Sequence, residues 1–293
     1  MSDGRGLAAS AASPNSSLNA LTIDLEDWFH ICGVETLAPR HWDTLPSRIT
    51  PPTDWLLDLL DHRQIRATFF VVGWIAERHP ELVQKIACAG HEIGSHSYWH
   101  RRAYELDRQA FADDVAASCR AVAAIGAAPV TAFRAPEWSI NDSSIWALDE
   151  LVHLGFRVDA SMAPLKLVGS VTFPREPHVR ETAHGRIVEV PPLVADRFGQ
   201  VMPLGWGWGL RMSSPLRVLH AIGTLNDRGQ PAVLTIHPWE LDPDPPRVTL
   251  PPRLYFAHYF RMRGFRERLS TILAGASFGP ISTLSRGNAV TQG

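Results

Sequence analysis

Short apolar segments of strand length alternate with amphipathic helical segments along most of this 293-residue chain. Residues 67–72 form an apolar run of strand length, and residues 107–125 show helical spacing that ends at Gly126. Strands that are apolar along their whole length are buried on both faces, so the alternation predicts parallel strands covered by helices. The same patterns predict strands at 20–23, 130–134, 156–159, 188–190 and 233–236, and helices at 52–63, 74–89, 143–154 and 214–226.

Polar motifs follow the ends of these predicted strands, where α/β barrels build their active sites. A doubly wound open sheet is the competing architecture, but it predicts a glycine-rich phosphate turn after the first strand. The acidic run Asp24-Leu25-Glu26-Asp27 occupies that place instead. We therefore predict an α/β fold closed into a barrel.

Two histidines one helical turn apart, His96 and His100, follow the segment 91–94. Imidazoles with this spacing can direct their nitrogens at a single ion. The acidic run after the first strand offers a carboxylate that completes a two-histidine, one-carboxylate site. Together, these motifs predict a hydrolytic metal centre.

Composition and charge indicate which kinds of partner and which cellular compartment to expect for this chain. The formal net charge is −2, so the charge of the whole molecule favours neither nucleic acid nor an anionic membrane. No apolar stretch is long enough to cross a bilayer, and residues 1–17 lack the pattern of an export signal. The three cysteines, Cys32, Cys88 and Cys119, are widely spaced and form no C-x-x-C pair. We expect a cytoplasmic protein with reduced thiols.

Five strand ends carry unusual residues: Asp24-x-Glu26-Asp27, His96-x-x-x-His100, Arg134-Ala135-Pro136-Glu137-Trp138, Asp159-Ala160-Ser161 and His237-Pro238-Trp239-Glu240. Their order resembles the polysaccharide deacetylases with the NodB homology domain (carbohydrate esterase family 4). The resemblance extends beyond the usual catalytic domain to His258-Tyr259, and is greatest to the branch associated with exosortase-linked exopolysaccharide loci. It implies a distorted (β/α) barrel of the NodB type with an irregular C-terminal extension. The domains expected are a flexible leader at 1–19, the barrel at 20–240, an extension packed on it at 241–280 and a flexible tail at 281–293.

The resemblance also implies roles for single residues. Asp24 would be the catalytic base and His237 the catalytic acid. Arg134 would orient Asp24 and keep it ionised, and Asp159 would orient or tune His237. A bound Zn²⁺ would activate water and polarise the carbonyl of an amide.

The third metal ligand stays open between two residues. The commonest family pattern has adjacent aspartates, base then ligand, which this chain lacks. If the strand continues past Asp24, its period of two places Glu26 on the same face and favours Glu26 as the ligand. If the chain turns directly after Asp24, Asp27 can reach the metal.

Tryptophans near the motifs are candidates for sugar contacts, because aromatic faces bind the apolar faces of sugar rings. We expect Trp28, Pro136 and Trp138 to contact substrate, although core packing accounts for at least half of the ten tryptophans.

The predicted function is the metal-dependent removal of N-acetyl groups from N-acetylhexosamine units of a polysaccharide or its lipid-linked precursor. The predicted cofactor is one divalent ion, Zn²⁺ before others. The partners expected are an N-acetylated glycan and the exopolysaccharide assembly machinery. Two alternatives remain, a small-amide hydrolase of the allantoinase-like type on the same fold and an inactive barrel that only binds glycan.

Overall fold

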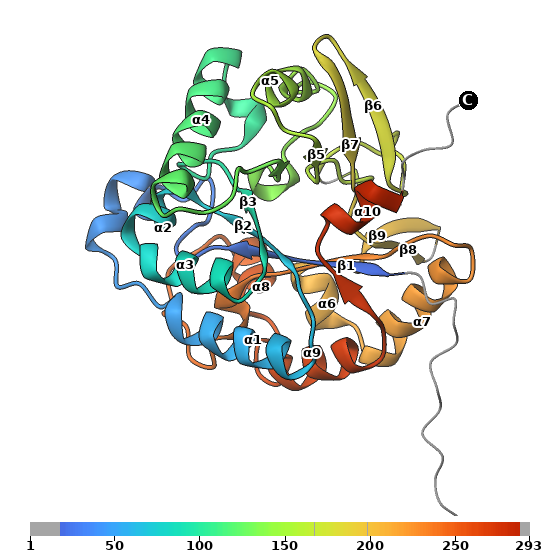
Figure 1. Ribbon diagram of the computed structural model, residues 1–293. Helices are drawn as coiled ribbons and strands as arrows, with labels where there is room; N and C mark the ends of the chain where they lie inside the picture. Colours follow the sequence, from blue (N-terminus) through green and yellow to red (C-terminus); the bar gives the residue numbers. More distant parts are fainter. Residues whose placement is uncertain (1–17, 167, 198, 288–293) are drawn as a thin grey trace, which may run out of the picture.

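The computed structural model describes residues 18–166, 168–197 and 199–287, and most of its strands form one curled sheet surrounded by helices (Figure 1). Within these residues the sheet has nine strands in the order β10-β1-β2-β3-β4-β5-β7-β6, with β11 paired to β1. All pairs are parallel except the β6–β7 hairpin. The strands are β1 (Asn19–Leu25), β2 (Thr68–Val71), β3 (Glu92–Ser95), β4 (Ala132–Phe133), β5 (Val158–Asp159), β6 (His178–Thr182), β7 (Gly185–Glu189), β10 (Val233–Ile236) and β11 (Phe278–Gly279).

The barrel closes without a regular ladder between β7 and β10. Past β7, the N–H of Val190 donates to the carbonyl oxygen of Asp159, and the N–H of Leu193 donates to that of Val233. The segment after β7 therefore crosses from one edge of the sheet to the other. A separate hairpin, β8 (Val194–Arg197) and β9 (Gln200–Pro203), follows this crossing. This irregular closure makes the barrel distorted.

Strand β1 shows how the sequence positions the site. Leu21, Ile23 and Leu25 pack in the core between the sheet and the helices, and Ala20 lies in a second core inside the barrel. Because side chains alternate along a strand, Asp24 points to the same side as Ala20, toward the barrel axis. Its carboxylate is thus carried inside the barrel at the carboxyl end of β1.

The helices cover the outside of the sheet. The helix predicted at 74–89 is wrong in one respect, because it is two helices that meet at His79-Pro80. Proline has no N–H to donate and its ring clashes with the preceding turn, so it begins a new helix. The helices are α1 (Thr50–His62), α2 (Gly73–Arg78), α3 (Pro80–Cys88), α4 (Arg108–Ala124), α5 (Ala147–His153), α6 (Gly207–Met212), α7 (Pro215–Asn226), α8 (Pro252–Tyr259), α9 (Phe265–Ala274) and α10 (Ser282–Gly287).

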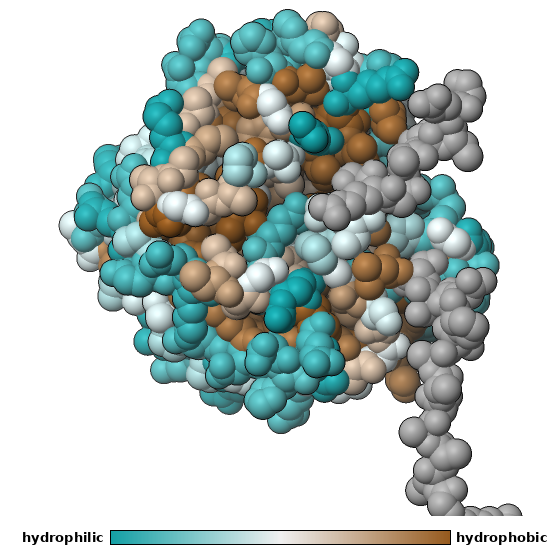
Figure 2. All heavy atoms as spheres, in the orientation of Figure 1, coloured by the Kyte–Doolittle hydropathy of each residue, from teal (hydrophilic) through white to brown (hydrophobic). Residues whose placement is uncertain are grey.

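The C-terminal segment is part of the folded barrel, which corrects the tail expected at 281–293. Ile281 and Leu284 are buried in the inner core with Phe70 and Val158. The N–H of Ile281 donates to the hydroxyl of Thr68 on β2. On the face of the molecule shown in Figure 2, hydrophobic residues gather toward the centre and hydrophilic residues form the rim. Residues 288–293 and the leader up to residue 17 lie outside the described residues.

Substituting Ile281 tests whether this segment belongs to the cooperative fold. Ile281→Ala is expected to lower the free energy of unfolding by about 2–5 kcal/mol, the range for truncating a buried isoleucine. Urea unfolding followed by circular dichroism measures it. Leu216→Ala, at a side chain that is 78% exposed, is the control and should change stability little. An unchanged midpoint for Ile281→Ala would show that the segment frays independently.

In the part of the chain that the structure describes, no helix combines the length and the apolar character that crossing a bilayer requires.

Candidate metal and catalytic centre

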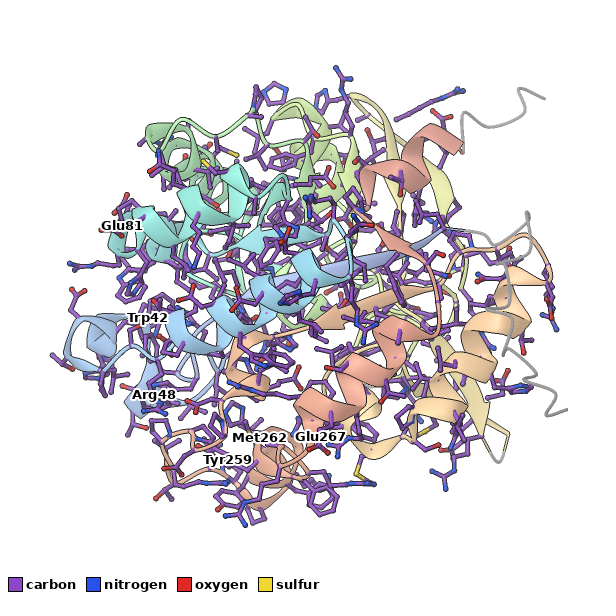
Figure 3. All side chains as sticks on the ribbon, turned by 60° about the horizontal axis from the view of Figure 1, so that its bottom comes forward. Trp42, Arg48, Glu81, Tyr259, Met262 and Glu267 are labelled. Carbon is purple, nitrogen blue, oxygen red and sulfur yellow. The ribbon has the colours of Figure 1, made fainter. Side chains whose placement is uncertain are left out.

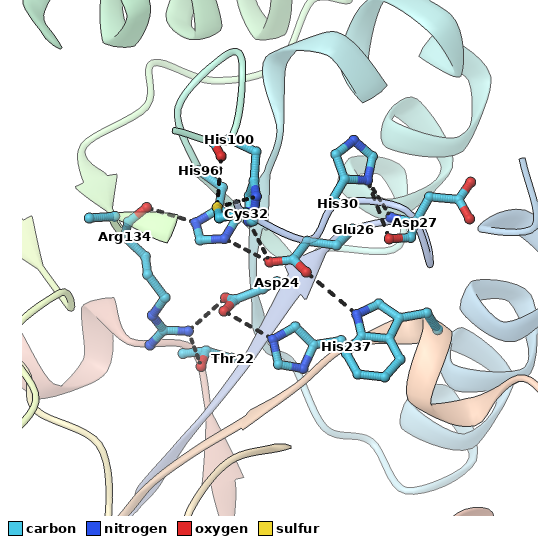
Figure 4. A network of polar contacts seen from close by, with 12 residues as sticks. Thr22, Asp24, Glu26, Asp27, His30, Cys32, His96, His100, Arg134 and His237 are labelled. Carbon is cyan, nitrogen blue, oxygen red and sulfur yellow. Dashed lines mark hydrogen bonds and ion pairs between the residues drawn. The ribbon is translucent and has the colours of Figure 1, made fainter. Parts of the chain in front are cut away.

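Three buried side chains meet at the carboxyl ends of β1 and β3. Oε1 of Glu26 lies 3.0 Å from Nε2 of His96 and 2.9 Å from Nε2 of His100 (Figure 4). Each side chain offers one atom to a common centre, and these atoms lie within 4.8 Å of one another. This is the two-histidine, one-carboxylate arrangement, with Glu26 as the carboxylate.

The loop that carries the two histidines has an unusual backbone. Ser97 and His100 both have positive φ angles, 61° and 50°, which non-glycine residues adopt rarely and at a cost of order 1–3 kcal/mol. The buried carboxylate of Asp114 on α4 compensates by accepting the N–H groups of Tyr98 and Trp99 at 2.8 and 3.3 Å. The buried role of Asp114 could not be predicted from the sequence, because a single aspartate within a helical segment has the same pattern as an aspartate exposed to solvent.

The hydrogen bonds of the histidines test whether these residues fit a metal ion. Nδ1 of His96 lies 2.7 Å from the carbonyl oxygen of Arg134. A carbonyl only accepts, so Nδ1 carries the proton and Nε2 of the neutral ring presents a lone pair. That lone pair faces the Glu26 carboxylate, and two acceptors this close repel unless a proton or a cation lies between them. The donor set fits a divalent ion, and two nitrogens with one carboxylate suit Zn²⁺.

The charge of Glu26 agrees with this reading. Burial acts to raise the pKa of its carboxyl, but the neighbouring His100 and His237 hold that pKa well below the usual range. The group is therefore an ionised carboxylate in a buried place, which is the form that binds a metal.

A second set of side chains surrounds Asp24. Nη1 of Arg134 donates to Oδ1 of Asp24 and to the hydroxyl of Thr22, both at 2.8 Å, and neither charged group is exposed to solvent (Figure 4). The guanidinium lies between the rings of Phe70 and Trp138, at 4.4 and 4.3 Å. Because one oxygen of Asp24 is engaged by Arg134, the other, Oδ2, is left toward His237.

His237 stands opposite Asp24, with its Nε2 3.7 Å from Oδ2 of that carboxylate. Its Nδ1 lies 2.8 Å from Oε2 of Glu240, which also accepts the backbone N–H of His237 at 3.1 Å. Burial acts to lower the pKa of His237, but the carboxylates of Glu26 and Glu240 raise it to about 9. The ring is thus oriented by Glu240 and favoured in its protonated form.

Glu240 is itself held by Arg211. The two side chains are fully buried and form an ion pair of 2.7 Å. The same guanidinium donates to the carbonyl oxygens of Ala257, His258 and Phe260. Sequence reasoning assigned no role to Glu240, although its motif was singled out, and gave no sign of Arg211, which stands alone in the segment of α6.

Asp159 does not take the place expected for it beside His237. Its carboxylate accepts the hydroxyl of Ser161 at 2.5 Å and shares a hydrogen bond with Glu189. Burial raises the pKa of both Asp159 and Glu189, as expected for two carboxyl groups that share one site. Within the described residues, the carboxylate bonded to His237 is that of Glu240.

Asp27 and Trp28 also lie away from the three-residue group. The Asp27 carboxylate accepts the hydroxyl of Ser47 at 2.5 Å and the N–H of Arg48 at 3.0 Å, so it ties the loop after β1 to residues 47–48. Trp28 is only 3% exposed and donates its indole N–H to the carbonyl oxygen of Pro46. The expectation that Trp28 contacts sugar is therefore corrected, because core packing covers its ring.

Pro136 and Trp138 belong to a short buried 3₁₀ turn, Pro136–Trp138. Trp138 covers the guanidinium of Arg134 with one face and lies 5.1 Å from the ring of Trp206. It is only 5% exposed, so it supports the Arg134–Asp24 pair instead of presenting a free face to a sugar.

An accessible aromatic side chain lies elsewhere beside the site. A cavity of about 270 Å³ is lined by His100, Trp42 and Trp99, together with Arg101 and Glu105. Trp99 is 37% exposed. Sequence reasoning missed it, although it lies within the histidine motif. Trp99 thus offers an aromatic face next to the candidate centre.

Two family models match consecutive parts of the chain. Residues 41–157 match the family described as Polysaccharide deacetylase, and residues 160–286 match a Domain of unknown function (DUF3473). The first region contains His96, His100 and Arg134, and the second contains His237 and Glu240. The candidate centre is thus built from both regions and from Asp24 and Glu26, which precede them.

Curated relatives are similar over short stretches. A peptidoglycan-N-acetylglucosamine deacetylase from Bacillus cereus is 35% identical over 63 residues, which are 22% of this chain and 23% of that protein. A chitooligosaccharide deacetylase from Bradyrhizobium sp. is 31% identical over 67 residues, 23% of this chain and 31% of that protein. The chain therefore aligns with less than a third of the length of either relative.

Solved structures share the whole fold. The crystal structure of a protein provisionally assigned as a polysaccharide deacetylase, from Mycobacterium smegmatis, aligns with a TM-score of 0.60 at 20% sequence identity. The alignment covers 96% of this chain and 93% of that one. A peptidoglycan N-acetylglucosamine deacetylase has a TM-score of 0.50 at 16% identity, covering 92% and 88%. This likeness confirms the predicted distorted barrel. The family model relates residues 41–157, about two fifths of the chain, to polysaccharide deacetylases.

Proposed function

We propose that the protein is a metal-dependent hydrolase that removes N-acetyl groups from N-acetylhexosamine units of a polysaccharide or its precursor. The observation that carries the proposal is that Asp24 and His237 both lie beside the Glu26 carboxylate, with one polar atom of each of the three side chains within 4.8 Å of the others, and that each is held by its own buried partner. Amide hydrolysis requires a base for water and an acid for the leaving amine, and these two groups have the chemistry for those tasks.

Asp24 is suited to be the base. Its Oδ1 is held by Arg134, which fixes the orientation of the carboxylate, while Oδ2 faces His237 across 3.7 Å and has the lone pairs to accept a proton from water. A divalent ion held by Glu26, His96 and His100 would supply the remaining chemistry, by acidifying water and polarising the amide carbonyl.

His237 is suited to be the acid. With Nδ1 bonded to Glu240, its Nε2 is the nitrogen that faces the site and can give a proton to the leaving nitrogen. We assign Glu240 the positioning task that the sequence suggested for Asp159, because Glu240 fixes both the ring and the backbone of His237. Arg211 keeps Glu240 charged in its buried position.

The proposed substrate is an N-acetylated glycan, and the proposed setting is exopolysaccharide assembly. The names of the two curated relatives support the first part, since both are deacetylases of N-acetylated sugars. The exposed face of Trp99 beside the 270 Å³ cavity supports it too, because aromatic rings stack on sugars. The second part rests on the motifs shared with the exosortase-linked branch, from Asp24 to Tyr259.

Release of acetate from defined N-acetylglucosamine oligomers, with and without chelator, tests the proposed function. We expect release that the chelator abolishes and that a divalent ion restores. Hydrolysis of small amides such as allantoin with no release from oligomers would favour the allantoinase-like alternative. Oligomer binding without any hydrolysis would favour the glycan-binding barrel.

Metal content identifies the third ligand. Glu26→Gln is expected to lose the bound ion, because a neutral amide replaces the ionised carboxylate. Asp27→Asn should keep it, since Asp27 is bonded to Ser47 and Arg48. Elemental analysis of the purified variants measures both. His96→Ala should lose the ion, whereas the exposed His220→Ala is the matched control. Metal loss in Asp27→Asn alone would reverse the assignment.

A further inference from the structure

The C-terminal extension concentrates positive charge in a chain that is otherwise balanced. Residues 245–266 contain five arginines and no acidic residue, whereas the whole chain has 28 basic and 30 acidic residues. Four of the five, Arg247, Arg253, Arg261 and Arg263, are exposed. Among the described residues, none of these four forms a salt bridge; Arg261 donates to the carbonyl oxygen of Met212, and Arg247 lies 4.3 Å from the ring of Tyr259.

Helix α8 adds large aromatic side chains to the same region. Tyr255 and Phe256 are 43% and 49% exposed, and Phe260, directly after the helix, is 39% exposed. The rings of Phe256 and Phe260 stack on each other at 4.3 Å. A hollow of about 520 Å³ is lined by Arg247, Leu250 and these three rings. We call these three rings and the four exposed arginines the α8 surface.

The opposite side of α8 is fixed to the folded protein. His258 stacks on Trp239 at 4.1 Å, and the indole N–H of Trp239 lies 3.4 Å from the Glu26 carboxylate. Tyr259 and Met262 form a buried cluster with Leu250, and Figure 3 labels both in its lower part. The α8 surface therefore lies on a helix whose opposite side packs, through His258 and Trp239, next to the candidate centre.

We propose that the α8 surface binds an anionic lipid bilayer, with the aromatic rings in the headgroup region and the arginines on lipid phosphates. Clustered aromatic side chains flanked by arginine are suited to the interface of a bilayer, where rings bury apolar area and guanidinium groups pair with anionic headgroups. The net charge of the chain does not oppose this, because the attraction acts within a Debye length of the surface.

Two other occupants fit this surface less well. A second copy of the chain meeting it symmetrically would bring four arginines against four arginines, and the α8 surface contains no carboxylate among its own seven side chains. A neutral glycan carries no anionic group that could pair with the four arginines. In addition, the rings of Phe256 and Phe260 stack on each other, so neither ring presents both faces to a sugar. A bilayer satisfies both the charge and the apolar area. The inference does not depend on the proposed hydrolysis, since binding needs no chemistry.

Co-sedimentation of the full chain with vesicles tests the proposal. We expect binding to vesicles of phosphatidylcholine with phosphatidylglycerol, weaker binding to phosphatidylcholine alone, and a marked loss at high salt. Each arginine near such a surface contributes about fivefold to binding, so the triple variant Arg253→Gln/Arg261→Gln/Arg263→Gln should bind roughly a hundredfold less. Phe256→Ser/Phe260→Ser should weaken binding as well.

A matched triple variant controls for net charge. Arg63→Gln/Arg120→Gln/Arg228→Gln removes the same charge from exposed positions outside the C-terminal extension and should bind nearly as well as the wild type. Equal losses in the two triple variants would overturn the proposal, as would no binding to anionic vesicles. It would also be overturned if Phe256→Ser/Phe260→Ser abolished a concentration-dependent dimer or oligosaccharide binding but left vesicle binding intact.

Discussion

Asp24→Asn is expected to lower the turnover of acetate release by about a hundredfold or more, the usual range for a general acid–base group, while the metal content stays unchanged. Asparagine can still accept the hydrogen bond from Nη1 of Arg134, but it cannot take a proton from water. Steady-state turnover on N-acetylglucosamine oligomers and elemental analysis on the same preparation measure the two effects.

The fold of this variant needs its own measurement. Arg134 loses its counter-charge in a fully buried place, which commonly costs about 3–5 kcal/mol of stability. Thermal unfolding therefore has to show that the variant is folded at the assay temperature. Asp27→Asn, in the same acidic run, is the comparison and should keep its turnover per folded molecule. Wild-type turnover of folded, metal-loaded Asp24→Asn would mean that another group accepts the proton.

Local patterns predicted the barrel and part of the site. The apolar runs of β1, β2 and β10 identified buried parallel strands, since their whole length avoids water. Period-two alternation favoured Glu26 over Asp27 on the condition that the strand continues past Asp24, and Glu26 is the carboxylate that meets His96 and His100. In these cases, the information lies within a few neighbouring residues.

Contacts between distant segments could not be predicted in this way. Arg211 and Glu240 are 29 residues apart and meet only because α6 and the turn after β10 pack together. A buried ion pair of this kind carries no signal in either segment. Asp159 was assigned a role because its motif matched the family pattern. In the structure, its carboxylate is hydrogen-bonded to Glu189 of β7 instead. The residue beside His237 was therefore identified from the structure alone.

Tryptophan was difficult for a different reason. Its ring is apolar and its N–H is polar, so the same residue serves in a core, over a cation or beneath a sugar. Trp28 is in the core and Trp138 covers Arg134, whereas Trp99 is accessible. The sequence identifies where a tryptophan lies, but the packing around its ring decides whether a face of the ring is accessible to a sugar.

The region described as a domain of unknown function contains His237, the proposed acid, and the residues that hold it. His237, Glu240 and Arg211 all lie within residues 160–286, and Arg211 bonds the end of α8 as well. The two histidines of the candidate metal site and Arg134 lie in the preceding region, residues 41–157, and Asp24 and Glu26 precede both regions. Because neither region holds all the groups that the proposed reaction requires, we expect the two to be active only as one folded unit.

His237→Ala should keep its metal and lose most amide hydrolysis, but it should lose much less activity on an activated aryl acetate. An amine leaves a tetrahedral intermediate poorly unless it is protonated, whereas an activated phenolate leaves without a proton. The ratio of the two activities, measured on one preparation, therefore reports the acid itself and is insensitive to small losses of folded protein. His220→Ala, at an exposed histidine, should leave the ratio unchanged.

A matched variant of Glu240 separates positioning from proton donation. Glu240→Gln keeps His237 but removes the charge that orients its ring, so it should shift the ratio in the same direction by a smaller factor. It also leaves Arg211 without its counter-charge, and thermal unfolding has to confirm that the variant remains folded. If His237→Ala lowers amide and ester hydrolysis in equal proportion, His237 serves binding or structure. The proton for the leaving amine would then have to come from another group.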